Sequence, residues 1–328
     1  MKEEESSQRF EARRMAEMIN PTGKILVGIA GWSYPDWKGL VFPRETQFNK
    51  LEYLAGFFST VEINTTFYSI PSLKLVEGWL RSVRQNAEFS FAVKMYKQLT
   101  HGEDTQIGQP ALVESTVRAF KEVIEPLRGA RKLGALLLQF PYRFHDTAEN
   151  RKYLCAVLDV FQEYPLVVEV RHRSFAQPSF YQLLRERQIA FANIDQPDVS
   201  ANLKSAEVFT SSHLSYLRFH GRNAANWFAP EAGRDGRYDY DYSAEELEGY
   251  LGMVREFRRQ GGTLYVIFNN HYRAAEVKNA LEFLHQITGQ KVLVMPKLLK
   301  AYPSLEAITL PSTPDKIPTH PGENYSLF

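Results

Sequence analysis

The stretch FSFAVK, residues 89–94, is one instance of the repeated sequence pattern that decides the fold. It is a short apolar run that ends in a charged residue, as expected of a buried strand whose last side chain reaches an open end. Seven further short apolar runs, most of which end in a polar or charged residue, occur along the chain at intervals of roughly thirty residues. The predicted strands are Ile25–Ala30, Val61–Asn64, Phe89–Lys94, Ala135–Gln139, Leu166–Arg171, Ile189–Asp195, Tyr216–His220 and Leu264–Asn270.

Helix-like stretches separate most of these runs. They are Lys50–Phe58, Leu73–Arg84, Ala111–Leu127, Ala148–Phe161, Phe180–Gln188, Ala244–Arg259 and Ala274–Ile287. The stretch Gln196–Ser212 after the sixth run is only weakly helical, so one degenerate unit is expected there. Strand-plus-helix units in this number predict an α/β fold, a closed TIM-type (β/α)8 barrel with its active site at the C-terminal strand ends.

The domain organisation follows from the composition along the chain. Residues 1–22 are polar and residues 302–328 are rich in proline, so we expect two tails around a single barrel domain over residues 23–301. Two connections are long, namely Tyr96–Pro110 after the third strand and Gly221–Tyr242 after the seventh. Long loops in compact domains are often functional or mobile.

The overall composition excludes several classes of protein. With 39 basic and 38 acidic residues the net charge is +1, which argues against a surface that coats a polyanion but leaves room for a local basic pocket. The single cysteine, Cys155, excludes an internal disulfide and a cysteine-rich metal site. No apolar run reaches the length of a signal peptide or the ~20 residues of a membrane span, so we expect a cytoplasmic protein with no membrane partner.

Side-chain alternation along the strands assigns the polar residues to one face. In residues 89–94, the bulky side chains of Phe89, Phe91 and Val93 suit packing against helices, whereas the small face that ends in Lys94 suits the barrel interior. The same alternation elsewhere predicts a group of charged and polar side chains at the inner mouth. The group consists of Glu62, Glu169, Asp195, Lys94, Arg171, Arg218, His220, Gln139 and Asn269. Because an unpaired buried charge is costly, these groups are expected to pair with each other, with water or with a ligand.

Several short motifs, in order along the chain, carry a family resemblance. They are GWSYPDW (31–37), VEINTTFY (61–68), LTH (99–101), EVRH (169–172), RFHG (218–221) and FNN (268–270). Together they resemble the YecE-like family, also called domain of unknown function 72, from about Lys24 to about Gln286. The resemblance implies a TIM-type barrel. It implies no activity, because the family name records an unknown function.

The leading hypothesis for the mouth is an anion site. Arg171 and Arg218 offer planar guanidinium groups suited to phosphate, and Lys94 adds a third positive charge. Phosphate often binds such barrels near the loops after strands seven and eight, and Asn270 is expected to cap the helix that follows the eighth strand. The alternative is that the two arginines only neutralise the neighbouring carboxylates.

Aromatic residues follow several predicted strand ends and form an expected rim. They are Trp32, Tyr34, Trp37, Phe67, Tyr68 and Trp227. Such rings can stack on a nucleobase or a sugar, or they can form a hydrophobic lid that needs no ligand. The lid is the favoured interpretation for Trp37 and Phe67, whereas Trp32, Tyr68 and the neighbouring Asn64 are candidate ligand-binding residues.

General acid–base chemistry is a further alternative. The candidate catalytic residues are Glu62, Glu169, Asp195 and His220, and His101 and His172 are further proton carriers beside the ligand. The carboxylates would divide acid and base roles if their surroundings separate their pKa values, and two of them would form a glycosidase-like pair at a suitable separation.

No cofactor is predicted. The sequence contains neither a glycine-rich dinucleotide fingerprint nor a P-loop, and it lacks HExxH and CxxC spacings. A divalent metal held by Glu169, Asp195 and His220 is a minor alternative, because the lysine and the arginines of the mouth would crowd that site with positive charge.

The predicted partner is therefore a small phosphate-bearing ligand, such as a nucleotide, a nucleic-acid end or a phosphosugar. In one version of the hypothesis the protein also hydrolyses or isomerises this ligand. The rivals are a non-catalytic ligand- or nucleic-acid-binding protein, a carboxylate-based glycosidase-like or metal-dependent hydrolase, and a structural barrel whose charges satisfy each other.

Overall fold

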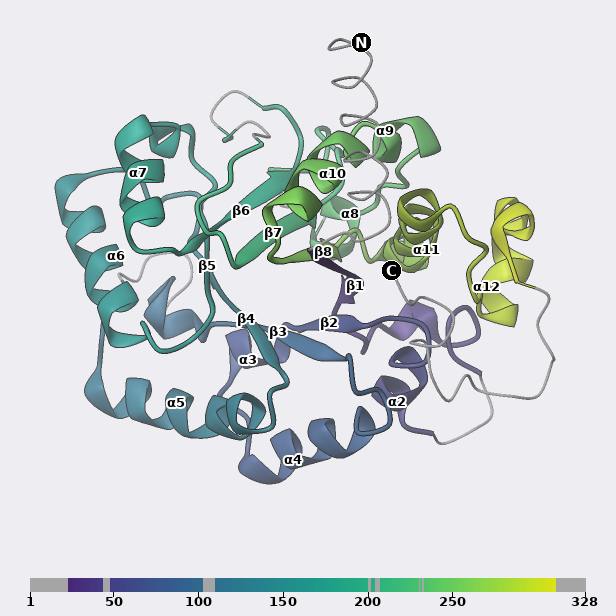
Figure 1. Cartoon of the computed structure of the whole chain (residues 1–328), viewed down its shortest axis with the longest axis horizontal. Coiled ribbons are helices and arrows are strands. Elements are labelled where there is room, and N and C mark those ends of the chain that lie inside the picture. Colours follow the sequence, from purple (N-terminus) through teal and green to yellow (C-terminus); the bar gives the residue numbers. More distant parts are fainter. Residues whose placement is uncertain are drawn as a thin grey trace, which may run out of the picture.

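A computed structural model describes residues 23–43, 48–102, 110–199, 202–203, 207–229, 231 and 233–310. Within this part of the chain, eight parallel strands pair in sequence order and close into a barrel that helices surround (Figure 1). The strands are β1 Lys24–Ala30, β2 Thr60–Ile63, β3 Ser90–Lys94, β4 Leu133–Gln139, β5 Leu166–Glu169, β6 Ala190–Asp195, β7 Leu214–Phe219 and β8 Thr263–Phe268. The predicted TIM-type (β/α)8 barrel is confirmed.

Several helices begin at a residue whose side chain caps the first turn. The Ser72 side chain caps α4, Thr147 caps α6, and Ser243 forms a capping box with Glu246 at α9. The predicted helix Ala244–Arg259 is two helices, because α9 ends at Gly249 and α10 starts at Leu251. The helices are α2 Lys50–Leu54, α3 Thr65–Tyr68, α4 Leu73–Ser82, α5 Glu114–Gly129, α6 Ala148–Val160, α7 Pro178–Glu186, α8 Gly233–Arg237, α9 Ala244–Glu248, α10 Leu251–Gln260, α11 Ala275–Thr288 and α12 Pro296–Ala301.

Short 3-10 turns complete the strand-to-helix connections. They are η1 Pro35–Trp37, η2 Lys97–Leu99, η3 Arg173–Phe175, η5 Tyr272–Ala274 and η6 Pro303–Ile308. No described helix has the length and apolar character that crossing a bilayer requires.

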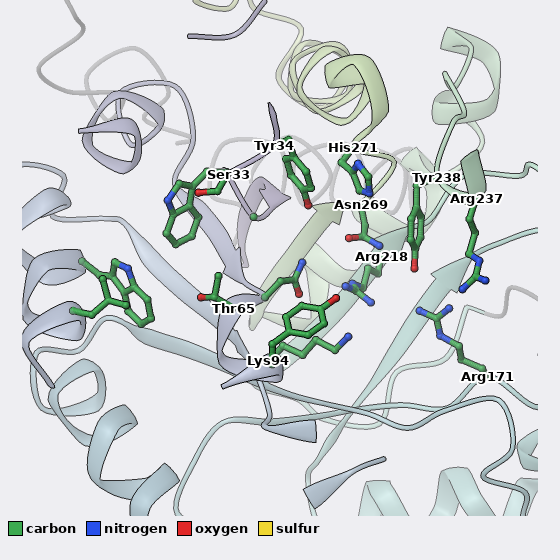
Figure 2. Close-up of a pocket in the computed structure, with 16 residues that line it drawn as sticks. Ser33, Tyr34, Thr65, Lys94, Arg171, Arg218, Arg237, Tyr238, Asn269 and His271 are labelled. Atoms are coloured by element: carbon green, nitrogen blue, oxygen red, sulfur yellow. The ribbon is translucent and has the colours of Figure 1, made fainter. Parts of the chain in front are cut away.

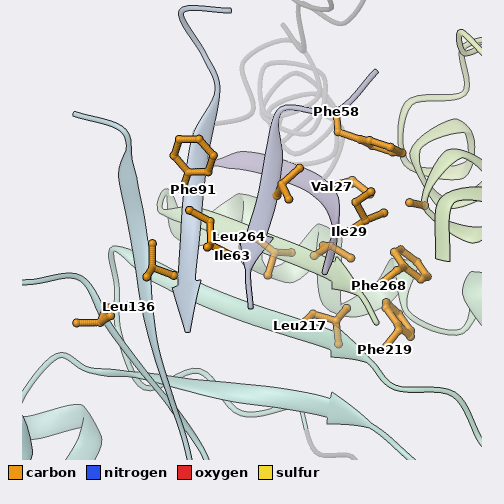
Figure 3. Packing of buried hydrophobic residues seen from close by; sticks show 14 of the residues in the cluster. Val27, Ile29, Phe58, Ile63, Phe91, Leu136, Leu217, Phe219, Leu264 and Phe268 are labelled. Carbon is orange, nitrogen blue, oxygen red and sulfur yellow. The ribbon is translucent and has the colours of Figure 1, made fainter. Parts of the chain in front are cut away.

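Two apolar layers lie on the two sides of the strand wall. The outer layer packs the bulky strand residues against the helices, and Figure 3 shows part of it around Ile29, Phe91 and Phe268. The inner layer is a separate cluster that includes Ala92 and Tyr216. The alternation predicted for residues 89–94 therefore holds, with the phenylalanines outside and Ala92 inside.

The unit after β6 is degenerate, as the sequence predicts. The described residues between β6 and β7 form no helix. In its place the Asn193 side chain binds the backbone of Val208, accepting from its N–H at 2.9 Å and donating to its carbonyl at 3.0 Å. This amide ties the irregular connection to the barrel.

The compact domain continues beyond the predicted end at residue 301. The η6 turn packs Leu305 fully into the core, and the backbone of Val292 bonds to the carbonyl of Ile308 and the N–H of Leu310, both at 2.8 Å. Residues 302–310, assigned from the sequence to the C-terminal tail, therefore pack against the barrel, and Pro303 lies in the first turn of η6. The expected tails over residues 1–22 and 311–328 lie outside the described residues.

Candidate functional site

A buried ion-pair network closes the barrel below its C-terminal mouth. Arg218 on β7 donates from Nη2 to Glu62 Oε1 on β2 at 2.6 Å and from Nη1 to Glu169 Oε2 on β5 at 3.0 Å. Both carboxylate side chains are 0% exposed. The Tyr216 hydroxyl donates to the second oxygen of Glu62 at 2.7 Å. The strands thus bring together three of the residues that alternation assigned to the inner mouth.

Arg171 and His220 extend this network toward the opening. Arg171 donates from Nε to Glu169 Oε1 at 3.0 Å, and its Nη2 lies 2.9 Å from the same oxygen. The Asn269 amide nitrogen lies 3.0 Å from His220 Nδ1. The other ring nitrogen, Nε2, lies 3.3 Å from Glu169 Oε1 and 3.2 Å from Arg171 Nη2.

The electrostatics of the network fix its protonation. Burial alone would raise the pKa of Glu169, but the Arg218 and Arg171 guanidinium groups hold it well below its usual range. Burial, with the same two arginines, lowers the pKa of His220 to about 3. At neutral pH, Glu169 is therefore ionised and His220 is neutral. Neither group is set up to exchange a proton with a ligand.

A cavity of about 600 Å³ opens above the network. Its lining consists of Gly31, Trp32, Ser33, Tyr34, Asn64, Thr65, Tyr68, Leu75, Trp79, Lys94, Arg171, Arg218, Arg237, Tyr238, Asn269 and His271, many of which Figure 2 labels. Among these described lining residues there is no aspartate or glutamate. Glu62 and Glu169 lie beneath the floor, so the cavity presents cations and aromatic rings to a ligand.

Lys94 lies at the end of β3 and lines this cavity. Its Nζ is 4.0 Å from the centroid of the Phe67 ring, and no other described residue binds it through a hydrogen bond or an ion pair. Burial, and then the nearby charge of Arg218, lowers the pKa of Lys94 to about 7. Of the titratable groups predicted at the mouth, this amine is the one poised to change charge near neutral pH.

Arg237 and Tyr238 are lining residues that the strand pattern did not predict. They lie in and just after α8, within the long connection Gly221–Tyr242 that its length marked as functional. The buried Nε atom of Arg237 has no hydrogen-bond partner among the described residues. In Figure 2 the guanidinium groups of Arg171 and Arg237 point toward one another. Trp79 and His271 also line the cavity without having been predicted.

Asp195 is not at the inner mouth, and this prediction is wrong. On β6 the side chains of Ala190, Ala192 and Ile194 join the inner layer, so Asp195 points outward. There it binds a second set of partners. Arg222 Nη2 donates to Oδ2 at 2.7 Å, the Tyr242 hydroxyl donates to Oδ1 at 2.6 Å, and the Tyr250 hydroxyl donates to Oδ2. We call Asp195, Arg222, Tyr242 and Tyr250 the outer cluster.

The structure also places four other predicted ligand-binding residues outside the cavity lining. His101 is buried against the Phe67 ring, with 4.8 Å between ring centroids. Gln139 points inward but donates to the carbonyl of the adjacent Phe140 at 2.7 Å. His172 stacks on His145 with 3.9 Å between ring centroids.

Asn270 is the fourth of these residues, and the helix cap predicted for it is wrong. Its side chain donates to Tyr240 O and Asn279 Oδ1, both at 2.8 Å. The η5 turn intervenes before α11, whose N-cap is Ala274 in a left-handed conformation with φ of 60°. Asn270 therefore fixes the end of the long connection and does not present helix amides to a ligand.

The aromatic rim divides into residues that line the cavity and residues that are packed away from solvent. Trp32 and Tyr68 line the cavity, as do the predicted Asn64 and Asn269. Trp37 and Phe67 are only 0% and 7% exposed and belong to the packed cover of the barrel. Trp227 is buried, with its ring 5.8 Å from Arg171 Cζ.

The described residues provide no metal-ligand set. No group of three or more His, Cys, Asp or Glu side chains in this part of the chain is arranged to hold an ion. The predicted combination of Glu169, Asp195 and His220 is divided, because Asp195 lies on the other side of the strand wall.

Comparisons with known proteins identify the family to which this chain is similar. A family model described as "Protein of unknown function DUF72" matches residues 26–302. The UPF0759 protein YunF of Bacillus subtilis is 27% identical over 286 residues, which cover 85% of this chain and 100% of that protein. The UPF0759 protein YecE of Escherichia coli is 30% identical over 154 residues, which cover 46% of this chain and 50% of that one.

Two solved structures share the architecture. A DUF72 family protein from Thermotoga maritima has 34% sequence identity and a TM-score of 0.71, covering 80% of this chain and 99% of that one. A DUF72 family protein from Enterococcus faecalis has 28% identity and a TM-score of 0.72, covering 83% and 98%. The family resemblance seen in the sequence motifs is confirmed.

Proposed function

Given that the chain belongs to the DUF72 family, whose activity its name leaves open, we propose that it binds a small phosphate-bearing ligand in the cationic mouth of the barrel. The observation that carries the proposal is the charge of the cavity lining. Arg171, Arg218 and Arg237 contribute positive charge to it, Lys94 adds an amine with a pKa of about 7, and no carboxylate among the described residues lines it.

The balance of charge supports an anionic ligand. Glu62 and Glu169 offset Arg218 and Arg171, to which they are bonded. Arg237 has no such carboxylate partner among the described salt bridges, and the buried Nε atoms of Arg218 and Arg237 are unpartnered there. A buried guanidinium without its hydrogen bonds is costly, so a bound anion would stabilise this arrangement.

The chemistry of the cations favours phosphate over a single carboxylate. A guanidinium presents a planar fork of donors that matches phosphate oxygens. Arg171 and Arg237 point toward one another in Figure 2, so one anion between them would contact both forks. A phosphate dianion has enough charge and acceptor oxygens for both.

The aromatic lining supports a ligand with a sugar or a flat ring. Trp32 and Trp79 meet edge to face at 6.3 Å, and the Tyr34 ring stacks on His271 at 4.3 Å. Tyr68 is 62% exposed although it is a large hydrophobic residue, which is expected of a ring that packs on a ligand. A volume of about 600 Å³ suits a nucleotide or a phosphosugar.

The carboxylate-based hydrolase is the less well supported alternative. Glu62 and Glu169 are both fully buried, and both bind Arg218. A glycosidase needs one protonated carboxyl group that reaches the substrate oxygen, whereas Glu169 is held ionised beneath the floor.

Ligand-dependent thermal unfolding tests the proposal. We expect inorganic phosphate, sugar phosphates or nucleoside monophosphates to raise the melting temperature, with about 2.7 kcal/mol of stabilisation at a hundred times the dissociation constant. Arg237→Gln should lower the affinity for these ligands at least tenfold, because the substitution removes one of the two guanidinium groups that would bind the phosphate. The matched control is Arg118→Gln, which alters an exposed ion pair with Glu114 on α5. Equal responses to phosphorylated compounds and their dephosphorylated forms would reject the proposal.

A further inference from the structure

Lys94 differs from Arg171 and Arg218 at the mouth, because it is not paired with a described carboxylate. Its backbone is fixed at the end of β3, where its carbonyl accepts a hydrogen bond from Thr66 Oγ1 at 2.6 Å. Its side chain enters the cavity, as Figure 2 shows. Nζ lies over the Phe67 ring, and no described carboxylate comes within ion-pair distance of it. The fold positions the amine, and its side-chain contact among the described residues is with the Phe67 ring.

Charged groups from several elements face this amine. Arg218 on β7 and Arg171 after β5 oppose its protonation, whereas Glu62 on β2 and Glu169 on β5 favour it. His101, from the connection after β3, is buried and neutral. The carboxylates are committed to the arginines, so their attraction for Lys94 is largely cancelled. With burial added, the pKa of Lys94 falls to about 7, and much of the amine is unprotonated at neutral pH.

A neutral amine is a poor anion anchor but a good nucleophile. We propose that Lys94 forms an imine with an aldehyde or ketone carbonyl of the phosphate-bearing ligand. This inference rests on the proposed function, because the phosphate bound by Arg171 and Arg237 would bring the carbonyl carbon to Nζ. It names the substrate class as phosphorylated carbonyl compounds.

Imine formation begins with attack by the neutral amine and ends with loss of water. The lone pair of Nζ attacks the carbonyl carbon while the C=O π pair moves to oxygen, and one proton passes from nitrogen to that oxygen to give a carbinolamine. A second proton, taken from solvent at the open mouth, lets the hydroxyl leave as water. The nitrogen lone pair then completes a protonated C=N bond. The iminium thus carries one positive charge more than the neutral amine and the carbonyl compound, and the bound phosphate offsets it.

The iminium would draw electrons from the neighbouring carbon. Removal of a proton from that carbon, or cleavage of its bond to the next carbon, then becomes easier. The reaction at the mouth is then an isomerisation or the formation or cleavage of a carbon–carbon bond.

Borohydride trapping tests the imine. The probes are pyridoxal 5′-phosphate, a phosphate-bearing aldehyde, and dihydroxyacetone phosphate, a phosphate-bearing ketone. The full-length protein is incubated with each at pH 7, reduced with borohydride, digested and mapped by mass spectrometry. We expect an adduct at Lys94 that forms on the order of a hundredfold faster than adducts at exposed lysines, because these are almost fully protonated at this pH. Saturating inorganic phosphate should slow it at least tenfold.

Two variants control the experiment. Lys94→Arg keeps the charge but cannot form the imine, so the rapid adduct should disappear while phosphate still raises the melting temperature. Lys97→Met removes a nearby lysine in η2 and should leave the Lys94 adduct unchanged. If Lys94→Arg fails to fold, the mapping of the wild-type protein still decides the matter.

The possible results separate this inference from the proposed function. Stabilisation by phosphate without an enriched Lys94 adduct would overturn the imine and leave the phosphate site intact. A rapid Lys94 adduct that phosphate does not slow would overturn the phosphate site, and with it the assignment of the substrate class. Labelling spread evenly over surface lysines would overturn the imine outright.

Discussion

Arg218 and Glu62 lie 156 residues apart in sequence, yet Nη2 and Oε1 meet at 2.6 Å inside the barrel. The same guanidinium reaches Glu169 on a third strand at 3.0 Å. Strands β2, β5 and β7 are therefore joined by one side chain at the level where the mouth begins. Removal of that side chain would leave two buried carboxylates without their counter-charge.

Arg218→Met is expected to lower the free energy of unfolding by about 3–5 kcal/mol, since each buried carboxylate loses its partner. Urea denaturation monitored by circular dichroism measures this loss. Arg118→Met, on the exposed face of α5, is the matched control and should leave the midpoint almost unchanged. Similar midpoints for the two variants would show that the network contributes little.

The lowered pKa of Lys94 should make the free energy of unfolding depend on pH in the neutral to alkaline range. Its pKa is about 7 in the folded protein and about 10.4 in an unfolded chain. Between these values the unfolded chain binds more protons, so the free energy of unfolding rises with pH. Below pH 7 the cost of burying the charge is fully present. Between pH 7 and 9.5, the wild type should gain about 1–3 kcal/mol relative to Lys94→Met. A constant difference between the two proteins across this range would contradict the lowered pKa.

His220 should remain neutral far below the usual histidine range. Its folded pKa is about 3, and that of an unfolded histidine is about 6.5, so stability is fully present above pH 6.5 and is lost as pH falls toward 3. Nitrogen-15 spectra of the histidine rings should show His220 as a neutral ring without a titration step between pH 5 and 8. From pH 7 to 4.5, the wild type should lose about 2 kcal/mol more than His220→Gln. A His220 titration midpoint near 6.5 would refute this assignment.

Asp195→Asn is expected to act on stability through the outer cluster. The substitution removes the charge that Arg222 and two tyrosine hydroxyls bind, which costs about 2–3 kcal/mol. Hydrogen exchange should accelerate over residues 221–242, because Tyr242 also donates to the N–H of Gly221 at 2.8 Å. Chemical denaturation and exchange mass spectrometry measure both effects. Unchanged exchange in this segment would show that the outer cluster does not hold it.

The repeat of apolar runs is sufficient to predict the barrel, because each strand is buried and therefore appears in the sequence as a short apolar run. Alternation also placed Glu62, Lys94, Glu169 and Arg218 correctly, since the opposite faces of their strands carry bulky apolar residues. It failed for Asp195, because β6 has apolar residues on both faces and the pattern does not say which one is inside.

The other residues of the mouth lie in loops and helices between the strands. Loop residues show no regular alternation of polar and apolar side chains from which their orientation could be predicted. Arg237 and Tyr238 reach the cavity from α8, and Trp79 reaches it from α4. Their positions depend on how each loop turns back over the barrel. A loop length identifies such a segment as a candidate without saying which of its side chains faces the ligand.

The segment that carries Arg237 and Tyr238 is held at both ends by contacts separate from the barrel network. Asn223 closes it by donating to the carbonyls of Gly236 and Asp239, both at 3.0 Å, and the outer cluster secures its flanks. The contacts that hold this segment do not involve the central salt bridges, so substitutions of Arg237 or Tyr238 can change the charge and shape of the cavity lining while those salt bridges stay in place.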